Sequence, residues 1–357
     1  MRLRRALSHR IRRPTNRSVA DAATDAVADA VAVPHLVVRT RDATQRRIDG
    51  HFRVARHVRG MDERAALRLL AADLPGAGDD AAVVDDLVVT TDMLHETTDF
   101  PAGTTRYTAG WRAVGASLSD VAAMGASATC AVAAYAAVEL DETELGDFVR
   151  GARDVCEAVG AEYVGGDLDT HREFTTATTA IGRTDDPVRR SGAAPGDLLC
   201  VTGDLGRSAA AVRLFEAGET DRANDLFRFT PRVEAGVALR GSATAMMDSS
   251  DGLARSVHQL AEASDCGFDL DFDALPVHDA VGEVATDSDD RRDLAAFFGE
   301  DFELVFTLPE SALDAARDAT DVSLTVVGKV VEESTEAAVV ADGEAVPDRG
   351  YTHGGDE

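Results

Sequence analysis

The chain has 357 residues, 45% of them hydrophobic, which is enough for two ordinary domains with a sizeable buried core. It carries 64 acidic against 36 basic residues, a formal net charge of −28, and Lys329 is the only lysine. This excess of acid indicates adaptation to molar salt, where the Debye length falls to ~3 Å; it argues against nucleic acid as a partner, and the hydrophobic content argues against a disordered acidic chain.

Residues 1–60 differ in composition from the rest of the chain. They hold 14 arginines and 5 acids, whereas the remaining 297 residues hold 22 basic and 59 acidic residues, a net charge of −37. An Arg-rich segment without stable hydrophobic periodicity is predicted to be poorly ordered. We expect an over-long translation start with Met61 as the native initiator; a genuine basic arm or targeting segment is the alternative.

The first predicted domain covers residues 61–185. An amphipathic helix begins at Met61, and the turn Gly78-Asp79-Asp80 leads into a strand. A second strand over Leu87–Thr91 is expected to end on Asp92. Further along we expect a helix over 107–124 with Trp111, Val114, Leu118 and Val121 at helical spacing, a strand over about 128–138, a helix over 142–159 after an Asp141 cap, a short strand over 161–164, the turn Gly165-Gly166-Asp167 and a Thr-rich strand over 174–183.

The second predicted domain covers residues 186–357, after a boundary at 184–197 that is marked by Pro and Gly. Its pattern predicts a strand over 198–202, helices over 207–217 and about 231–240, the segment Met246-Met247-Asp248, a helix that opens after Ser249-Ser250-Asp251-Gly252, and strands near 303–307 and 324–330. Strands and helices are mixed with no simple βα alternation. The sequence therefore predicts a mixed α/β fold of two domains.

Six short clusters place an Asp beside Gly, Ser or Thr at the edge of an apolar element. They are Gly78-Asp79-Asp80, Thr90-Thr91-Asp92, Leu118-Ser119-Asp120, Gly165-Gly166-Asp167, Asp248-Ser249-Ser250-Asp251-Gly252 and Gly299-Glu300-Asp301. Mg²⁺ prefers such oxygen ligands and keeps waters that phosphates can replace. Magnesium ions that bridge phosphate oxygens supply the charge stabilisation that phosphoryl transfer needs.

Each cluster taken alone is more often a simple turn. Asp120 is the exception, because it stands in an otherwise apolar helix, between Leu118 and Val121. An unpaired acid would be costly to bury there, and a bound metal would explain it. His95 lies near Asp92, but a single His is more often structural or solvated.

Several motifs of other classes are missing. The sequence has no G-x-x-x-x-G-K-[ST] loop, no G-x-S-x-G and no HExxH, and Lys329 lies late, in a predicted strand. ATP would therefore be held by metals, Arg and backbone. No apolar stretch reaches the ~18 residues of a membrane helix, and no secretory signal is evident. The four cysteines lie far apart without a CxxC pair, which favours a reduced cytoplasmic protein.

The ordered set of these clusters resembles the thiamine-monophosphate kinase family, in the superfamily of aminoimidazole-ribotide synthetase. The match covers about residues 61–357. The blocks that carry it are Gly78–Val84, Thr90–Leu94, Leu118–Ala126, Gly165–Asp167, Arg190–Asp197, Asp248–Leu253 and Gly299–Phe306. The resemblance implies an aminoimidazole-ribotide synthetase-like fold of two α/β domains, with a homodimer formed through N-terminal-domain strands. It implies direct transfer of the γ-phosphoryl group of ATP to thiamine monophosphate, which yields thiamine diphosphate without a phosphoenzyme.

The resemblance also assigns roles to single residues. Several magnesium ions would be held by Asp80, Thr90, Thr91, Asp92, Asp120, Asp167, Asp248 and Asp251, with Asp92, Asp120 and Asp251 as the catalytic members. ATP would contact Gly166, Asp167, Arg190 and Ser250. The thiamine end would contact Glu300 and Tyr351, and an acid and an aromatic face suit a cationic thiazolium.

One position departs from the family pattern. Family members often carry a substrate-contacting His before the Phe at position 100, and Asp99 stands there in this chain. Two alternatives remain open beside the kinase: a related ATP-dependent synthetase with another acceptor, and a non-catalytic protein that binds nucleotide or thiamine phosphate.

Overall fold

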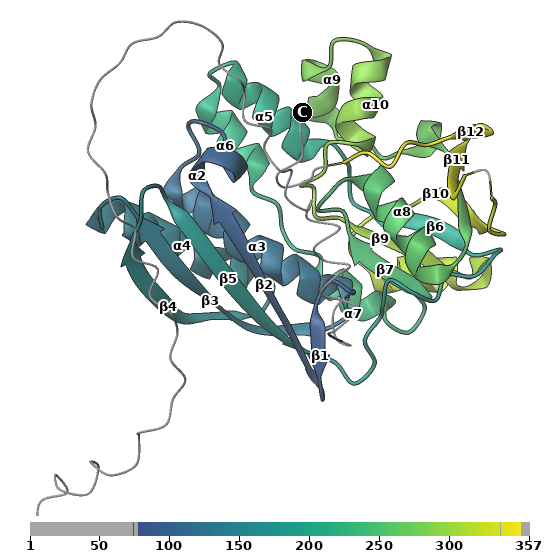
Figure 1. Ribbon diagram of the computed structural model, residues 1–357, viewed down its shortest axis with the longest axis horizontal. Helices are drawn as coiled ribbons and strands as arrows, with labels where there is room; N and C mark the ends of the chain where they lie inside the picture. Colours follow the sequence, from purple (N-terminus) through teal and green to yellow (C-terminus); the bar gives the residue numbers. More distant parts are fainter. Residues whose placement is uncertain (1–73, 75–77, 336, 351–357) are drawn as a thin grey trace, which may run out of the picture. The chain divides into compact units, whose positions relative to one another are not determined.

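The computed structural model describes residue 74 and residues 78–335 and 337–350, all of which belong to one compact unit, Arg59–Glu357. The arginine-rich segment 1–60, the helix expected from Met61 and the substrate residue expected at Tyr351 lie outside the described residues. The described part is built on two β-sheets with helices packed against them (Figure 1).

The first sheet has the strand order β1-β2-β5-β3-β4 and is mostly antiparallel. Only the β3–β4 pair is parallel, and the helix between these strands makes that crossover possible. The strands are β1 (Ala82–Val84), β2 (Leu87–His95), β5 (Thr175–Arg183), β3 (Ser127–Ala137) and β4 (Glu162–Thr170).

Helices α3 (Arg106–Ala123) and α4 (Glu142–Ala158) cover one face of this sheet (Figure 1). The expected helical face of α3 is confirmed, because Val114, Leu118 and Val121 are fully buried. The two helices pack closely at Gly110, where an added Cβ would lie 2.1 Å from the Phe148 carbonyl oxygen. The expected Asp141 cap of α4 is also present: its Oδ1 accepts from the Thr143 and Glu144 amides at 2.9 Å.

Two local predictions in this half are wrong. The strand over Leu87–Thr91 does not end on Asp92 but continues to His95, because β5 pairs with it over its whole length. Gly165-Gly166-Asp167 is not a turn but part of β4, which runs alongside β3. A Cβ on Gly166 would lie 1.7 Å from the Ala133 carbonyl oxygen, so this Gly allows two strands to approach rather than a chain reversal.

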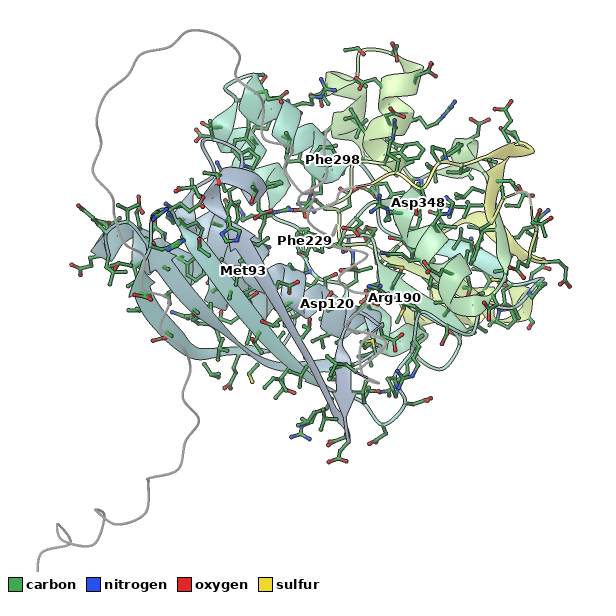
Figure 2. All side chains as sticks on the ribbon, viewed as in Figure 1. Met93, Asp120, Arg190, Phe229, Phe298 and Asp348 are labelled. Atoms are coloured by element: carbon green, nitrogen blue, oxygen red, sulfur yellow. The ribbon has the colours of Figure 1, made fainter. Side chains whose placement is uncertain are left out.

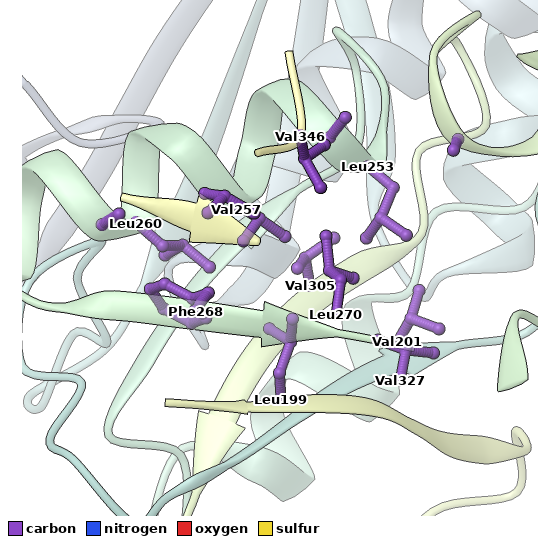
Figure 3. Close-up of a cluster of buried hydrophobic side chains, with 14 of the residues drawn as sticks. Leu199, Val201, Leu253, Val257, Leu260, Phe268, Leu270, Val305, Val327 and Val346 are labelled. Carbon is purple, nitrogen blue, oxygen red and sulfur yellow. The ribbon is translucent and has the colours of Figure 1, made fainter. Parts of the chain in front are cut away.

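The second sheet has seven strands in the order β12-β11-β8-β10-β6-β9-β7. They are β12 (Glu344–Ala345), β11 (Val339–Ala341), β8 (Gly267–Leu270), β10 (Leu324–Val331), β6 (Leu198–Thr202), β9 (Leu304–Leu308) and β7 (Ala245–Asp248). Helix α8 (Leu253–Ser264) packs on one face through Leu253, Val257 and Leu260 (Figure 3). Lys329 lies in β10, as expected, and pairs with Asp269 at 3.3 Å.

The other helices of the described residues are mostly short. They are α2 (Glu96–Asp99), α5 (Arg207–Glu216), α6 (Thr220–Phe227), α7 (Val233–Leu239), α9 (Asp279–Val284), α10 (Ser288–Ala296) and α11 (Leu313–Ala319). The C-terminal end of α3 also reaches the second sheet, because Ala122 and Ala123 share a core with Met246 and Phe306. Asp120, one turn earlier, is thereby brought to the junction of the two halves.

Candidate active site

Three carboxylates from distant parts of the sequence converge at this junction. Asp80 precedes β1, Asp120 lies in α3, and Asp248 is the last residue of β7. One oxygen from each carboxylate lies within 4.8 Å of the other two. Hard oxygen donors at this separation fit the ligand preference of Mg²⁺.

Hydroxyl side chains hold these carboxylates in place. Thr90 Oγ1 donates to Asp120 Oδ2 at 2.5 Å. Ser119 Oγ donates to Asp248 Oδ2 at 2.6 Å, and the Ser250 amide donates to Asp248 Oδ1 at 3.2 Å. These bonds leave the other lone pairs of the carboxylates free to bind a cation.

Asp92 lies beside this group, on the face of β2 that α3 covers. Its Oδ2 accepts from Ser117 Oγ at 2.5 Å, and Ser117 also contacts Thr178 Oγ1 at 2.7 Å. The three neighbouring elements β2, α3 and β5 therefore fix the position of this carboxylate.

The electrostatics of the cluster favour a bound cation. Burial, followed by the charges of Asp92, Asp248 and Asp80, raises the pKa of Asp120 well above its usual value. Burial and the charge of Asp80 raise the pKa of Asp248 to about 7, and burial raises the pKa of Asp92. Buried carboxylates that lie close to one another repel when they are ionised. They need a nearby positive charge to ionise together.

Arg190 supplies part of that charge. Its Nη2 and Nε donate to the two oxygens of Asp80 at 3.0 and 3.2 Å, and its amide donates to Asp79 Oδ1 at 3.0 Å. Burial lowers the pKa of Arg190, but the charge of Asp80 and its hydrogen bond outweigh this and raise the pKa above the usual range. Figure 2 shows Arg190 next to Asp120 at the junction. A guanidinium here can also bind phosphate oxygens.

A cavity of about 550 Å³ has Glu300 in its wall, and none of the clustered carboxylates lines it. Its walls are aromatic and aliphatic, with carboxylates at Asp99, Glu216 and Glu300; the apolar lining includes Phe100, Val212, Phe215, Phe227 and Phe298. A cavity with these walls and these acids fits a cationic aromatic ring.

Glu300 connects the cavity to the carboxylate cluster. Its amide donates to the Ser250 carbonyl oxygen at 2.7 Å. Its charge also contributes, after burial, to the raised pKa of Asp92. Glu300 therefore belongs to the cavity wall and also contacts the loop that follows Asp248.

Asp99 lines the same cavity as Glu300. Its Oδ2 accepts from the His95 amide at 2.6 Å and from Thr98 Oγ1 at 2.9 Å, so one oxygen of this carboxylate stabilises the turn that forms α2. The ring of His95 contacts Thr175 Oγ1 at 3.0 Å, in agreement with the structural interpretation of that His.

Two family models match the chain in succession. Residues 78–184 match the AIR synthase related protein, N-terminal domain, and residues 194–341 match the C-terminal domain of the same proteins. The chain is 63% identical to the thiamine-monophosphate kinase of Halobacterium salinarum over 293 residues, which are 82% of this chain and 100% of that protein. The chain belongs to the thiamine-monophosphate kinase family.

Solved structures agree with this assignment. The thiamine-monophosphate kinase of Stenotrophomonas maltophilia K279a superposes with a TM-score of 0.68 at 33% identity, over 80% of this chain and 96% of that one. A chain described as AaThiL complexed with AMPPCP and TMP superposes with a TM-score of 0.74 at 26% identity, over 84% and 99%. The expected mixed α/β fold of two aminoimidazole-ribotide synthetase-like domains is confirmed.

Of the residues that the family resemblance assigned to metal, those on the first sheet are divided between its two faces. Thr90 and Asp92 face α3 with the cluster. Thr91 lies between them on the strand and therefore faces the open side, which is the face of the first sheet that α3 and α4 do not cover. Its Oγ1 donates to the Thr178 carbonyl oxygen at 2.8 Å. Asp167 is exposed on β4, with β5 and β3 between it and β2, about 14 Å away at ~4.8 Å per strand.

The remaining thiamine-monophosphate kinase residues lie in the loop after β7 or outside the described residues. Ser250 contacts both Asp248 and Glu300 through its backbone. Asp251 is half-buried and directly precedes Gly252, the N-cap of α8. The position of Tyr351 is not described, so its role stays a prediction.

Sequence patterns missed three residues of the site. Ser117 and Ser119 lie inside α3, and although Ser119 stands in the Leu118-Ser119-Asp120 cluster, only the fold shows that the two hydroxyls donate to Asp92 and Asp248. Arg112 is buried in α3 and pairs with Glu300, Nη2 to Oε2 2.5 Å. The sequence did contain a signal for Arg112. An Arg that follows Trp111 on an apolar helix face needs a partner when it is buried.

Two further predictions concern the cysteines and membrane-spanning helices. The four cysteines are free thiols, and burial raises the pKa of Cys156 and of Cys200 to about 12, so neither is a reactive thiolate near neutral pH. Within residues 78–335 and 337–350, no helix has the length and apolar character needed to cross a membrane.

Proposed function

We propose that this chain transfers the γ-phosphoryl group of ATP to the phosphate of thiamine monophosphate, yielding thiamine diphosphate and ADP. The observation that carries the proposal is the convergence of Asp80, Asp120 and Asp248, together with an acidic and aromatic cavity that Glu300 lines. The family assignment agrees with it, since the Halobacterium relative named thiamine-monophosphate kinase is covered over its full length.

Magnesium is the metal that this cluster suits. Asp80, Asp120 and Asp248 would hold it, with Asp92 and Thr90 alongside, and bound Mg²⁺ would neutralise the charge that develops on the phosphoryl oxygens. Asp251 follows Asp248 on the same loop and is assigned to a further ion by resemblance to the family.

The protein's own groups would place the two substrates. Arg190, already beside Asp80, would contact ATP phosphates as a bidentate donor, together with Ser250. The acidic, aromatic cavity would take the thiamine end, with Glu300 and Asp99 next to the cationic ring. The phosphate of thiamine monophosphate would then point toward the carboxylate cluster, in position for in-line attack on the γ-phosphorus.

A homodimer would form through the open face of the first sheet. The large hydrophobic side chains that the described residues expose all lie within residues 74–168, and on the open face Val84 and Met93 are each more than half exposed. Covering them with a second copy would remove apolar surface from water. Thr91 and Asp167 lie on this open side, so their assigned roles with metal and ATP depend on what the dimer brings near them.

The two family domains would be residues 61–185 and 186–357, with the active site between them. Residues 1–60 contain none of the carboxylate clusters, and we infer that they contribute nothing to catalysis. A protein that comprises residues 61–357 should therefore match the turnover of the full chain.

The direct test incubates the purified full chain with ATP, thiamine monophosphate and Mg²⁺ in molar KCl and measures thiamine diphosphate by chromatography. We expect stoichiometric thiamine diphosphate and ADP, and none of either when Mg²⁺ is chelated. ATP consumption that does not depend on thiamine monophosphate, or binding of both ligands without product, would contradict the proposal.

A further inference from the structure

Arg112 is a buried cation that pairs with Glu300, one of the acids that line the cavity of about 550 Å³, here named the acceptor cavity. Arg112 is 2% exposed and lies in α3, two turns before Asp120. The guanidinium Nη2 donates to Glu300 Oε2 at 2.5 Å and to the Glu300 carbonyl oxygen at 3.3 Å. A charge this deep is stable only where its partners are close and well directed.

The rest of the guanidinium is held on its other sides. Nη1 donates to the Phe227 carbonyl oxygen at 2.5 Å and to Ser208 Oγ at 3.3 Å. The guanidinium carbon lies 3.5 Å from the centroid of the Phe227 ring. These three contacts, from Ser208 in α5 and Phe227 at the end of α6, leave the group little freedom, so the carboxylate that it binds is equally restricted.

The main chain at Glu300 is also held in a costly conformation. Glu300 has φ of 63° and Phe302 has φ of 55°, a region that non-glycine residues seldom adopt. Ser208 Oγ donates to the Glu300 carbonyl oxygen at 2.6 Å, and the Glu300 amide donates to Ser250. Backbone contacts thus set where the residue sits, and Arg112 sets where its carboxylate points.

We propose that Arg112 is a positioning residue for the acceptor: it directs the Glu300 carboxylate into the acceptor cavity so that this carboxylate meets the cationic ring of thiamine monophosphate. The proposal rests on the proposed function and extends it to a residue that touches neither substrate nor metal. The side chain of Glu300 is 25% exposed while that of Arg112 is 3% exposed, so the acid reaches the cavity and the base supports it from behind.

Arg112 also balances charge. The guanidinium of Arg112 and the carboxylate of Glu300 attract each other directly. The buried guanidinium therefore compensates the charge of Glu300 without lining the cavity itself. The acid can therefore serve a cationic ligand while it lies close to a carboxylate cluster.

The test compares Arg112→Met, which keeps the length and apolar packing over Phe227, with Arg112→Lys, which keeps the charge. We expect Arg112→Met to raise the KM for thiamine monophosphate at least tenfold and to change the KM for ATP and kcat less than threefold. Arg112→Lys should recover most of the loss. Arg228→Met is the matched control, since Arg228 also contacts α3, at Thr108, but not Glu300, and we expect its KM values to match wild type.

A double-mutant cycle with Glu300→Gln decides whether Arg112 acts through Glu300. In the Glu300→Gln background, Arg112→Met should change the KM for thiamine monophosphate less than twofold. Equal effects in both backgrounds, or a parallel loss in the KM for ATP and in kcat, would show a general structural role and overturn the proposal. If Arg112→Met does not fold, Arg112→Gln, whose amide can still donate to the Phe227 carbonyl oxygen, carries the same comparison.

Failure of the proposed function is recognised separately. It would appear in the wild-type protein as absence of thiamine diphosphate. Calorimetric titration of thiamine monophosphate, in the presence of Mg²⁺ and a non-hydrolysable ATP analogue, measures its affinity without turnover. The same double-mutant cycle can then be evaluated from these affinities. The inference on Arg112 fails if wild type binds the acceptor and Arg112→Met binds it equally well.

Discussion

Ser119 Oγ lies 2.6 Å from Asp248 Oδ2, and this buried hydrogen bond joins helix α3 to the end of strand β7, 129 residues further along the chain. The two elements belong to the two successive family domains. The contact places Asp120, the next residue of α3, within reach of Asp248 and Asp80. Catalysis at this point therefore depends on the docking of one half of the chain against the other.

Asp120→Asn should abolish most of the activity without unfolding the protein. The substitution keeps the shape and removes one charge from the cluster, which should lower kcat on the order of 10²-fold or more. Because Asp120 is buried among other carboxylates, the metal-free variant should melt at the same temperature as wild type or higher. Steady-state kinetics and thermal melts with chelator measure the two effects.

The control for this variant is Asp318→Asn, which removes the same charge from an exposed position on α11. It should leave kcat unchanged. Near-wild-type turnover of Asp120→Asn would exclude the residue from the reaction.

Asp301 should make stability depend on pH. Burial raises its pKa to about 7, although the amides of Gly206 and Ser208 donate to its carboxylate at 2.6 and 2.9 Å and oppose the shift. The folded pKa thus exceeds the unfolded value of 3.8, so the stabilisation is complete below pH 3.8 and is lost as the pH rises through about 7. The shift corresponds to about 4 kcal/mol as an order of magnitude.

Denaturant unfolding of wild type and Asp301→Asn in molar KCl, at pH 5 and pH 8, measures this effect. We expect the advantage of wild type over Asp301→Asn to shrink by a few kcal/mol between these values. A constant difference, or one that grows with pH, would mean that the two backbone amides keep the carboxylate ionised.

The folded state should require high salt. The 297 residues after position 60 carry a net charge of −37, and repulsion among their surface acids opposes compaction until it is screened. Lowering KCl from molar to about 0.1 M should cause a cooperative loss of structure. Circular dichroism along a KCl series checks this, and a melting temperature that does not change with KCl would contradict it.

Met93→Asp should dissociate the proposed homodimer. Met93 is 57% exposed on the open face of the first sheet (Figure 2), and a charge there could not be buried against a second copy without cost. We expect sedimentation of a monomer together with a large loss of activity. Ala315→Asp adds the same charge to an exposed site on α11 and should remain dimeric; a dimeric Met93→Asp protein would move the interface elsewhere.

Local pattern was sufficient for the longer helices, for most of the long strands and for the class of site. Helical spacing of apolar residues predicted α3, the cap at Asp141 predicted the start of α4, and an acid between Leu118 and Val121 marked Asp120. Several short elements were missed, because so few residues leave little periodic signal. They are the helices α2, α6, α9, α10 and α11 and the strands β8, β11 and β12. Gly165-Gly166 was misread as a turn, since a Gly that admits a neighbouring strand looks the same in sequence.

The sequence by itself determined which residues are available for metal and phosphate binding: carboxylates beside Gly and hydroxyl residues, and a single lysine. Only the tertiary structure decided which of them meet. Asp80, Asp120 and Asp248 converge because α3 packs between two sheets. Arg112 pairs with Glu300, which lies 188 residues further along the chain. Spacing along a chain governs contacts within one helix or strand, whereas contacts between elements follow from how their apolar faces pack, which no local pattern encodes.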